Sequence, residues 1–149
     1  MAGFVATMRR RLRDGHEPLR EVSRSEQDWR EQLTGEQYRV LRAKGTERPF
    51  SGSHIHPSGP RKTFSCAGCG APLFNSEDQF DSGTGWPSFS DSLDGAVDVS
   101  RDFSLGLPRT DALCRRCGGH LGHRFNDGPH PSGVRYCINS AALTSGETE

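Results

Sequence analysis

The spacing of hydrophobic residues changes near residue 45. Beyond that point they form short runs, at residues 63–64, 96–99 and 134–138, separated by stretches containing Gly, Pro, Asn and Asp. Apolar and polar residues that alternate between turn residues are typical of half-buried strands. The pattern therefore predicts a strand-rich region after residue 45.

Helices are predicted ahead of these strands, over residues 25–44. Ser25 opens a Ser-x-x-Asp spacing and Thr34 opens a Thr-x-x-Gln spacing, and both are helix-capping patterns. Gly35 is a candidate break between two short helices. Gly45 is the expected C-terminal stop, because glycine readily adopts the conformation that ends a helix.

Size and composition indicate one domain with a modest core. The chain has 149 residues, of which 32% are hydrophobic, with 18 glycines and 9 prolines. A loop-rich chain with so small a core commonly needs a staple such as a structural metal. Residues 1–24 are predicted to be a charged, flexible lead-in, and residues 25–146 to be the folded domain.

The charge balance excludes an overall field that would attract nucleic acid. Lys plus Arg and Asp plus Glu number 19 each. The apolar run at residues 1–8 is too short for a signal peptide or a membrane span, so no membrane partner is expected. The following arginines have some character of an organelle import signal, which acidic residues soon dilute. A cytoplasmic protein is the expectation.

Four of the five cysteines form two Cys-x-x-Cys pairs, Cys66 with Cys69 and Cys114 with Cys117. Each pair is followed by glycine, which lets backbone N–H groups approach the sulfurs. Two such turns suit one tetrahedral zinc ion, and four thiolates close its coordination shell. The alternatives are a redox pair or two local disulfides, but a redox Cys-x-x-Cys is usually single and opens a helix.

Cys137 is the remaining cysteine, and it lies in a strand-like run two residues before Asn139. His120 and His123 lie upstream in a glycine-rich stretch that favours a loop. A lone thiol with histidine candidates is the sequence form of a cysteine nucleophile. Asn139, on the same face of a flat strand, could donate to an oxyanion or orient a base. The competing interpretation is an inert core cysteine with structural histidines.

Trp86 lies in an unusual glycine-flanked segment, residues 83–89. A rigid loop of this kind could present an apolar wall to a small methyl-bearing group. The competing interpretation is a core tryptophan.

These segments together resemble the B class of methionine-R-sulfoxide reductases, the peptide-methionine (R)-S-oxide reductase family. The resemblance covers about residues 26–144. The matching segments are residues 46–52, Cys66-x-x-Cys69, residues 72–74, residues 80–89, Cys114-x-x-Cys117, residues 120–123, residues 127–129 and residues 135–140.

The resemblance implies a mainly β fold of two antiparallel sheets, with short N-terminal helices and one structural zinc far from the active site. It implies that Cys137 attacks the sulfoxide sulfur and becomes a sulfenic acid. His123 and His120 would help to protonate the sulfoxide oxygen, and Asn139 would orient the site. The residues implied to bind substrate are Trp86, which takes the S-methyl group, Arg135 and Phe125.

One departure from the family pattern changes the expected cycle. Many members carry a resolving cysteine in the loop before the Gly-Trp-Pro segment, where this chain has Thr84. With four cysteines assigned to zinc, none is left to form a disulfide with Cys137. We therefore expect an external thiol, thioredoxin or another, to reduce the sulfenic acid of a monomeric enzyme. Arg124, where the family often has an apolar residue, has no assigned effect.

Two other functions remain open. A non-catalytic zinc-ribbon-like module would bind a protein or nucleic acid and would leave Cys137, the histidines and Trp86 unexplained. A thiol hydrolase would use Cys137 with His123 on an acyl substrate.

Overall fold

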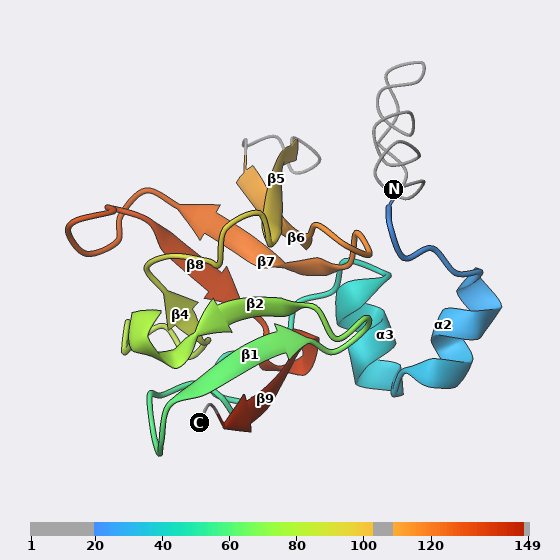
Figure 1. Cartoon of the computed structure of the whole chain (residues 1–149), viewed down its shortest axis with the longest axis horizontal. Helices are drawn as coiled ribbons and strands as arrows, with labels where there is room; N and C mark the ends of the chain where they lie inside the picture. Colours follow the sequence, from blue (N-terminus) through green and yellow to red (C-terminus); the bar gives the residue numbers. More distant parts are fainter. Residues whose placement is uncertain (1–19, 103–108, 148–149) are drawn as a thin grey trace.

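The computed structural model describes residues 20–102 and 109–147 (Figure 1). Within these residues two helices precede nine strands, and two short 3-10 turns interrupt the strands. In chain order the elements are α2 (Glu26–Gln32), α3 (Gly35–Leu41), β1 (Lys62–Cys66), β2 (Pro72–Asn75), η1 (Ser76–Asp78), β3 (Gln79–Phe80), β4 (Ser88–Phe89), β5 (Val97–Asp102), β6 (Arg109–Cys114), β7 (His120–Phe125), β8 (Arg135–Ile138), η2 (Ser140–Ala142) and β9 (Leu143–Glu147).

Both helices begin at the capping residues that the sequence indicates. The Ser25 side chain accepts a hydrogen bond from the N–H of Asp28, and Thr34 forms a reciprocal capping box with Gln37. Helix α3 ends at Leu41, before the predicted stop at Gly45, and the left-handed residue that follows is Lys44, with φ of 60°. The Gly45 N–H still donates to the Arg39 carbonyl of this helix at 2.7 Å.

The strands form two antiparallel sheets, which confirms the expected mainly β fold. One sheet has the order β2-β1-β9 and the other has the order β3-β4-β8-β7-β6-β5. Strands β8 and β9 are consecutive but lie in different sheets, and η2 connects them. The chain therefore crosses from one sheet to the other immediately after Cys137.

The core is aromatic where the sheets face each other. Phe74 stacks on Phe89 with ring centroids 4.3 Å apart, and Phe64 meets Phe89 edge-on at 5.3 Å. Leu121 and Ile138 are also fully buried in this cluster. Helix α3 adds to the core at the end of the sheets where α2 also lies (Figure 1).

Strand β7 holds both histidines, so the loop expected for residues 120–123 is wrong. The glycine that favoured a loop is required by close packing instead. A Cβ atom on Gly122 would lie 2.0 Å from the carbonyl oxygen of Cys137 on β8. The two strands therefore approach each other closely beside the lone thiol.

The predicted lead-in of residues 1–24 falls mostly on residues 1–19, which lie outside the described residues. Within the described part, the backbone N–H of Val22 donates to the Arg116 carbonyl, and Arg20 pairs with Asp98. The boundary at residue 25 stays a prediction. Helices α2 and α3 have seven residues each, whereas a helix needs roughly 20 to cross a membrane. Among the described residues, no helix is long and apolar enough to do so.

Candidate functional site

The four paired cysteines lie in the turns of two β-hairpins, one from each sheet. Cys66 ends β1 and Cys69 follows in the turn to β2, while Cys114 ends β6 and Cys117 follows in the turn to β7. The Sγ atoms of Cys66 and Cys117 are 3.7 Å apart, and those of Cys69 and Cys114 are 3.6 Å apart. All four sulfurs lie within 4.8 Å of one another.

This sulfur geometry fits a tetrahedral metal ion. Zinc–sulfur bonds of about 2.3 Å place the sulfurs about 3.8 Å apart. Backbone N–H groups of Gly68 and Gly119 also point at the sulfurs of Cys66 and Cys117, at 3.3 and 3.4 Å. The four thiols share hydrogen bonds, which raise the pKa of Cys66 and Cys114 and lower the pKa of Cys69 and Cys117. The cluster is therefore compatible with a zinc site.

Cys137 lies in the middle of the larger sheet and is partly buried. Its backbone partner is His123 on β7 on one side and Ser88 on β4 on the other. Burial raises the pKa of the Cys137 thiol above its usual value, although the Arg135 charge and hydrogen bonds from Arg135 and Thr84 act in the opposite direction. The fraction of Cys137 that is ionised therefore depends on Arg135 and Thr84.

Arg135 lies two residues before Cys137 on β8, on the same side of the strand. Its guanidinium donates to both carboxylate oxygens of Asp127, at 2.9 and 3.2 Å, and stacks 4.4 Å from the centre of the Phe125 ring. Hydrogen bonding to Arg135 lowers the pKa of Asp127. Two of the three residues expected to bind substrate, Arg135 and Phe125, thus contact each other close to the thiol.

His120 and His123 share one partner, the buried carboxylate of Asp111 on β6. Oδ1 of Asp111 is 3.4 Å from Nε2 of His120 and 3.3 Å from Nε2 of His123. Residues three apart on a regular strand face opposite sides. Here the register of β6 and β7 shifts between Ala112 and Leu113, and this bulge turns both rings toward the same carboxylate.

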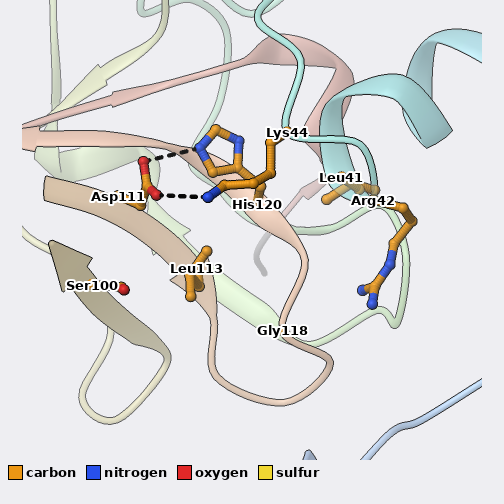
Figure 2. Close-up of a pocket in the computed structure, with 8 residues that line it drawn as sticks. All are labelled: Leu41, Arg42, Lys44, Ser100, Asp111, Leu113, Gly118 and His120. Carbon is orange, nitrogen blue, oxygen red and sulfur yellow. Dashed lines mark hydrogen bonds and ion pairs between the residues drawn. The ribbon is translucent and has the colours of Figure 1, made fainter. Parts of the chain in front are cut away.

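The two histidines differ in their surroundings. His120 is 3% exposed, and burial lowers its pKa, which the nearby Asp111 carboxylate opposes. His123 is 14% exposed and lies opposite Cys137. The other oxygen of Asp111, Oδ2, lies 3.3 Å from the ammonium group of Lys44 (Figure 2).

Asn139 and Trp86 are held by hydrogen bonds to the backbone. The Asn139 amide donates to the Leu121 carbonyl at 3.0 Å and accepts from the Glu47 N–H at 3.0 Å. One N–H of this amide therefore links the chain after β8 to β7. The Trp86 indole N–H donates to the Glu47 carbonyl at 3.0 Å, which orients the ring.

Glu47 is a site residue that sequence reasoning missed. Its carboxylate is buried and accepts hydrogen bonds from the N–H groups of Ser140 and Ala141, at 2.8 and 3.0 Å. It thereby fixes the chain just after Cys137. Asp111 was missed too. Its only sequence signal was an acidic residue within an otherwise buried strand next to a Cys-x-x-Cys turn.

Comparison with known proteins identifies the family. The SelR domain matches residues 33–147. A peptide methionine sulfoxide reductase MsrB from Leptospira interrogans is 55% identical over 124 residues, covering 83% of this chain and 94% of that protein. One from Bradyrhizobium diazoefficiens is 57% identical over 125 residues, covering 82% of this chain and 88% of that protein.

The chain belongs to the methionine-R-sulfoxide reductase B family. The resemblance seen in the motifs is thereby confirmed. A more distant relative, MsrB of Methanosarcina mazei, is 51% identical over 82% of this chain and 87% of its own length. Among solved structures, the Mis18 'Yippee-like' domain has a TM-score of 0.47 and 18% identity over 60% of this chain and 98% of that chain.

Replacing Arg135→Met should raise the pKa of Cys137, because the substitution removes the positive charge and hydrogen bond that oppose the effect of burial. The rate of alkylation by iodoacetamide, followed against pH, measures this directly, and the midpoint should move to higher pH. Arg61→Met is the control, since Arg61 is exposed and pairs with Glu77. A midpoint in Arg135→Met that is unchanged or lower would contradict the assignment.

Proposed function

We propose that this protein reduces the R epimer of methionine sulfoxide in peptides and proteins to methionine, with Cys137 as the nucleophile. The observation that carries the proposal is the position of this thiol in a chain of this family. The thiol is partly buried, lies opposite His123 and is close enough to the positive charge of Arg135 for that charge to lower its pKa. A cationic neighbour and a nearby imidazole are what a buried thiol needs to react.

The chemistry transfers one oxygen atom. The Cys137 sulfur attacks the sulfoxide sulfur and forms a sulfur–sulfur bond to it, and the protonated oxygen leaves the substrate as water. Water then adds to the Cys137 sulfur and breaks the sulfur–sulfur bond, which releases methionine and leaves a sulfenic acid, so the net change is transfer of one oxygen atom. The methionine sulfur is reduced by two electrons and the Cys137 sulfur is oxidised by two. His123, assisted by His120, delivers the proton that makes the oxygen a better leaving group. Asp111 orients both imidazoles for this role.

The substrate is expected to bind between the Trp86 loop and the Phe125–Arg135 pair. The Pro87 carbonyl accepts a hydrogen bond from the N–H of Ile138 at 2.9 Å, so this loop lies against β8 next to Cys137. The Trp86 ring, fixed by Glu47, would take the S-methyl group, while Phe125 and Arg135 would contact the rest of the substrate. Asn139 holds the strands in register behind these groups.

We also propose that the four-cysteine cluster holds one structural Zn²⁺. Cys66, Cys69, Cys114 and Cys117 would supply four thiolates and leave no open position for chemistry. The ion would link the two hairpins and so provide stability that a larger hydrophobic core would otherwise have to supply.

Elemental analysis should find one zinc per chain, and Cys117→Ser should lose it. A structural zinc contributes roughly 10–16 kcal/mol of folding free energy, so this variant should be largely unfolded by circular dichroism. Cys137→Ser is the matched control and should retain both zinc and fold. A zinc-free wild-type protein that unfolds cooperatively would contradict the proposal.

The activity test separates the sulfoxide epimers. Dithiothreitol-driven turnover of a peptide should consume R-methionine sulfoxide and leave the S epimer. Cys137→Ser should abolish this turnover, because serine is a far weaker nucleophile toward sulfur. If the folded, zinc-bound wild type reduced neither epimer, the non-catalytic binding module would become the better interpretation; trapping of an acyl-enzyme would favour the hydrolase.

The catalytic cycle is proposed to need a single cysteine. Beyond the four clustered cysteines, the sequence contains only Cys137. The residue beside the thiol in the Trp86 loop is Thr84, whose hydroxyl hydrogen-bonds Cys137 and Ser82. An external thiol would therefore attack the sulfenic acid, release water and leave a mixed disulfide that a second thiol reduces. Thioredoxin or a small thiol in the cytoplasm would serve a monomeric enzyme.

After one turnover without added thiol, wild-type protein should gain the mass of one oxygen atom on Cys137 and show no internal disulfide. Thr84→Cys should instead lose two hydrogen atoms and form a disulfide between the introduced thiol and Cys137, since the new sulfur would replace a group already in contact with that residue. Thr144→Cys, on the exposed face of β9, is the matched control and should behave as wild type. A stoichiometric Cys137 disulfide within the wild-type chain would rule out the single-cysteine cycle.

A further inference from the structure

Asp111, His120 and His123, here called the Asp111 cluster, form a second group of metal-ligand side chains, distinct from the four cysteines. One atom from each residue lies within 4.8 Å of the other two. Asp111 and His120 are each 3% exposed and His123 is 14% exposed. A carboxylate with two imidazoles is a common ligand set for zinc and other first-row divalent ions.

The spacing in this cluster is long for hydrogen bonds. Asp111 Oδ1 lies 3.4 and 3.3 Å from the two Nε2 atoms, whereas N–H···O bonds are usually about 2.7–3.2 Å. A tetrahedral ion with bonds of about 2.0–2.2 Å holds its ligands about 3.3–3.6 Å apart. The two distances from Asp111 therefore match edges of a metal coordination tetrahedron and are longer than those of short hydrogen bonds.

We propose that the Asp111 cluster binds one Zn²⁺ ion, or a similar divalent ion, separately from the four-cysteine site. Oδ1 of Asp111 and Nε2 of both histidines would be the ligands, and the fourth position would remain open to water. The ion would occupy the same nitrogen atoms that are proposed to deliver the proton. Its binding would therefore inhibit reduction of the sulfoxide, a consequence that depends on the proposed function.

The surroundings of the cluster provide access for an ion. A pocket of about 220 Å³ is lined by Asp111 and His120, together with Lys44, Arg42 and Ser100 (Figure 2). Lys44 contacts Oδ2 and leaves Oδ1 to the histidines. The Lys44 side chain is 58% exposed, so it can move toward solvent when an ion arrives.

The buried ring of His120 also suits a metal ligand. Its Nδ1 atom makes no hydrogen bond to the described residues, while Nε2 faces Asp111. When a metal takes the lone pair of Nε2, the ring proton must lie on Nδ1, where it needs an acceptor. The Val40 backbone raises the pKa of this ring, and we expect its carbonyl to accept that proton.

The test starts from protein that carries one zinc per chain, without added thiol. Titration calorimetry with Zn²⁺ should detect one further equivalent, and added Co²⁺ should give a visible absorption spectrum of tetrahedral nitrogen–oxygen type. Asp111→Asn and His123→Ala should each weaken this binding by at least about tenfold, because each removes a ligand. His56→Ala, at an exposed histidine that pairs with Asp81, is the control and should bind as wild type.

Two further variants keep the test independent of folding and of the reactive thiol. Lys44→Met should tighten binding, since it removes a competing cation from Asp111. Cys137→Ser should retain the second equivalent, and loss of binding in this variant alone would mean that the thiol, not the Asp111 cluster, holds the ion. Absence of a second equivalent in wild type, or unchanged affinity in both ligand variants, would also overturn the proposal.

Single-turnover measurements separate this inference from the proposed function. Reduced protein with one zinc should release one methionine per chain, and the second equivalent should slow this release at least about tenfold, in proportion to occupancy. Slowing that is absent at full occupancy would overturn the inhibitory role. If no methionine is released at one zinc but the second ion still binds through Asp111 and His123, the reductase function fails and the metal site stands.

Discussion

The contact between two cysteine-bearing hairpins is the constraint on which the rest of the structure depends. The β1–β2 turn belongs to the three-stranded sheet and the β6–β7 turn belongs to the six-stranded sheet, and their sulfurs meet at 3.6 and 3.7 Å. A chain with 32% hydrophobic residues has only a modest core, centred on the packing of Phe64 and Phe74 against Phe89, to join the sheets elsewhere. His120 begins β7 three residues after Cys117, so the same turn that collects the sulfurs also determines where the histidines start.

A second long-range link completes the frame around the thiol. The buried Glu47 carboxylate accepts from two backbone N–H groups just after β8, and the Glu47 backbone contacts both Asn139 and Trp86. A buried carboxylate is stabilised only when such donors satisfy it, which makes the arrangement specific. The loop before β1, the Trp86 loop and the segment after Cys137 are thus held by one side chain and its backbone.

Burial and neighbouring charges have opposing effects on the pKa values of Cys137 and His120. Burial raises the pKa of Cys137, and Arg135 and Thr84 counter it through charge and hydrogen bonds. Asp111 performs a similar balancing role for His120, whose burial would otherwise favour the neutral ring still more strongly. The same buried carboxylate that contacts both imidazoles would also supply the third ligand of the proposed metal site. The proposed proton delivery and the proposed metal inhibition would therefore be alternative uses of one group of atoms.

Much of the outline was determined by the sequence itself. The helix starts at Ser25 and Thr34, the strand runs, the paired cysteines and the family motifs all depend on residues a few positions apart, so local patterns reveal them. Other features were decided only by the tertiary structure: the bulge that turns His120 and His123 to one side, the bracing role of Asn139, and the link from Glu47 to Ser140 across 93 positions. No local pattern predicts these, because each depends on which strands lie side by side and on which buried polar groups remain to be satisfied.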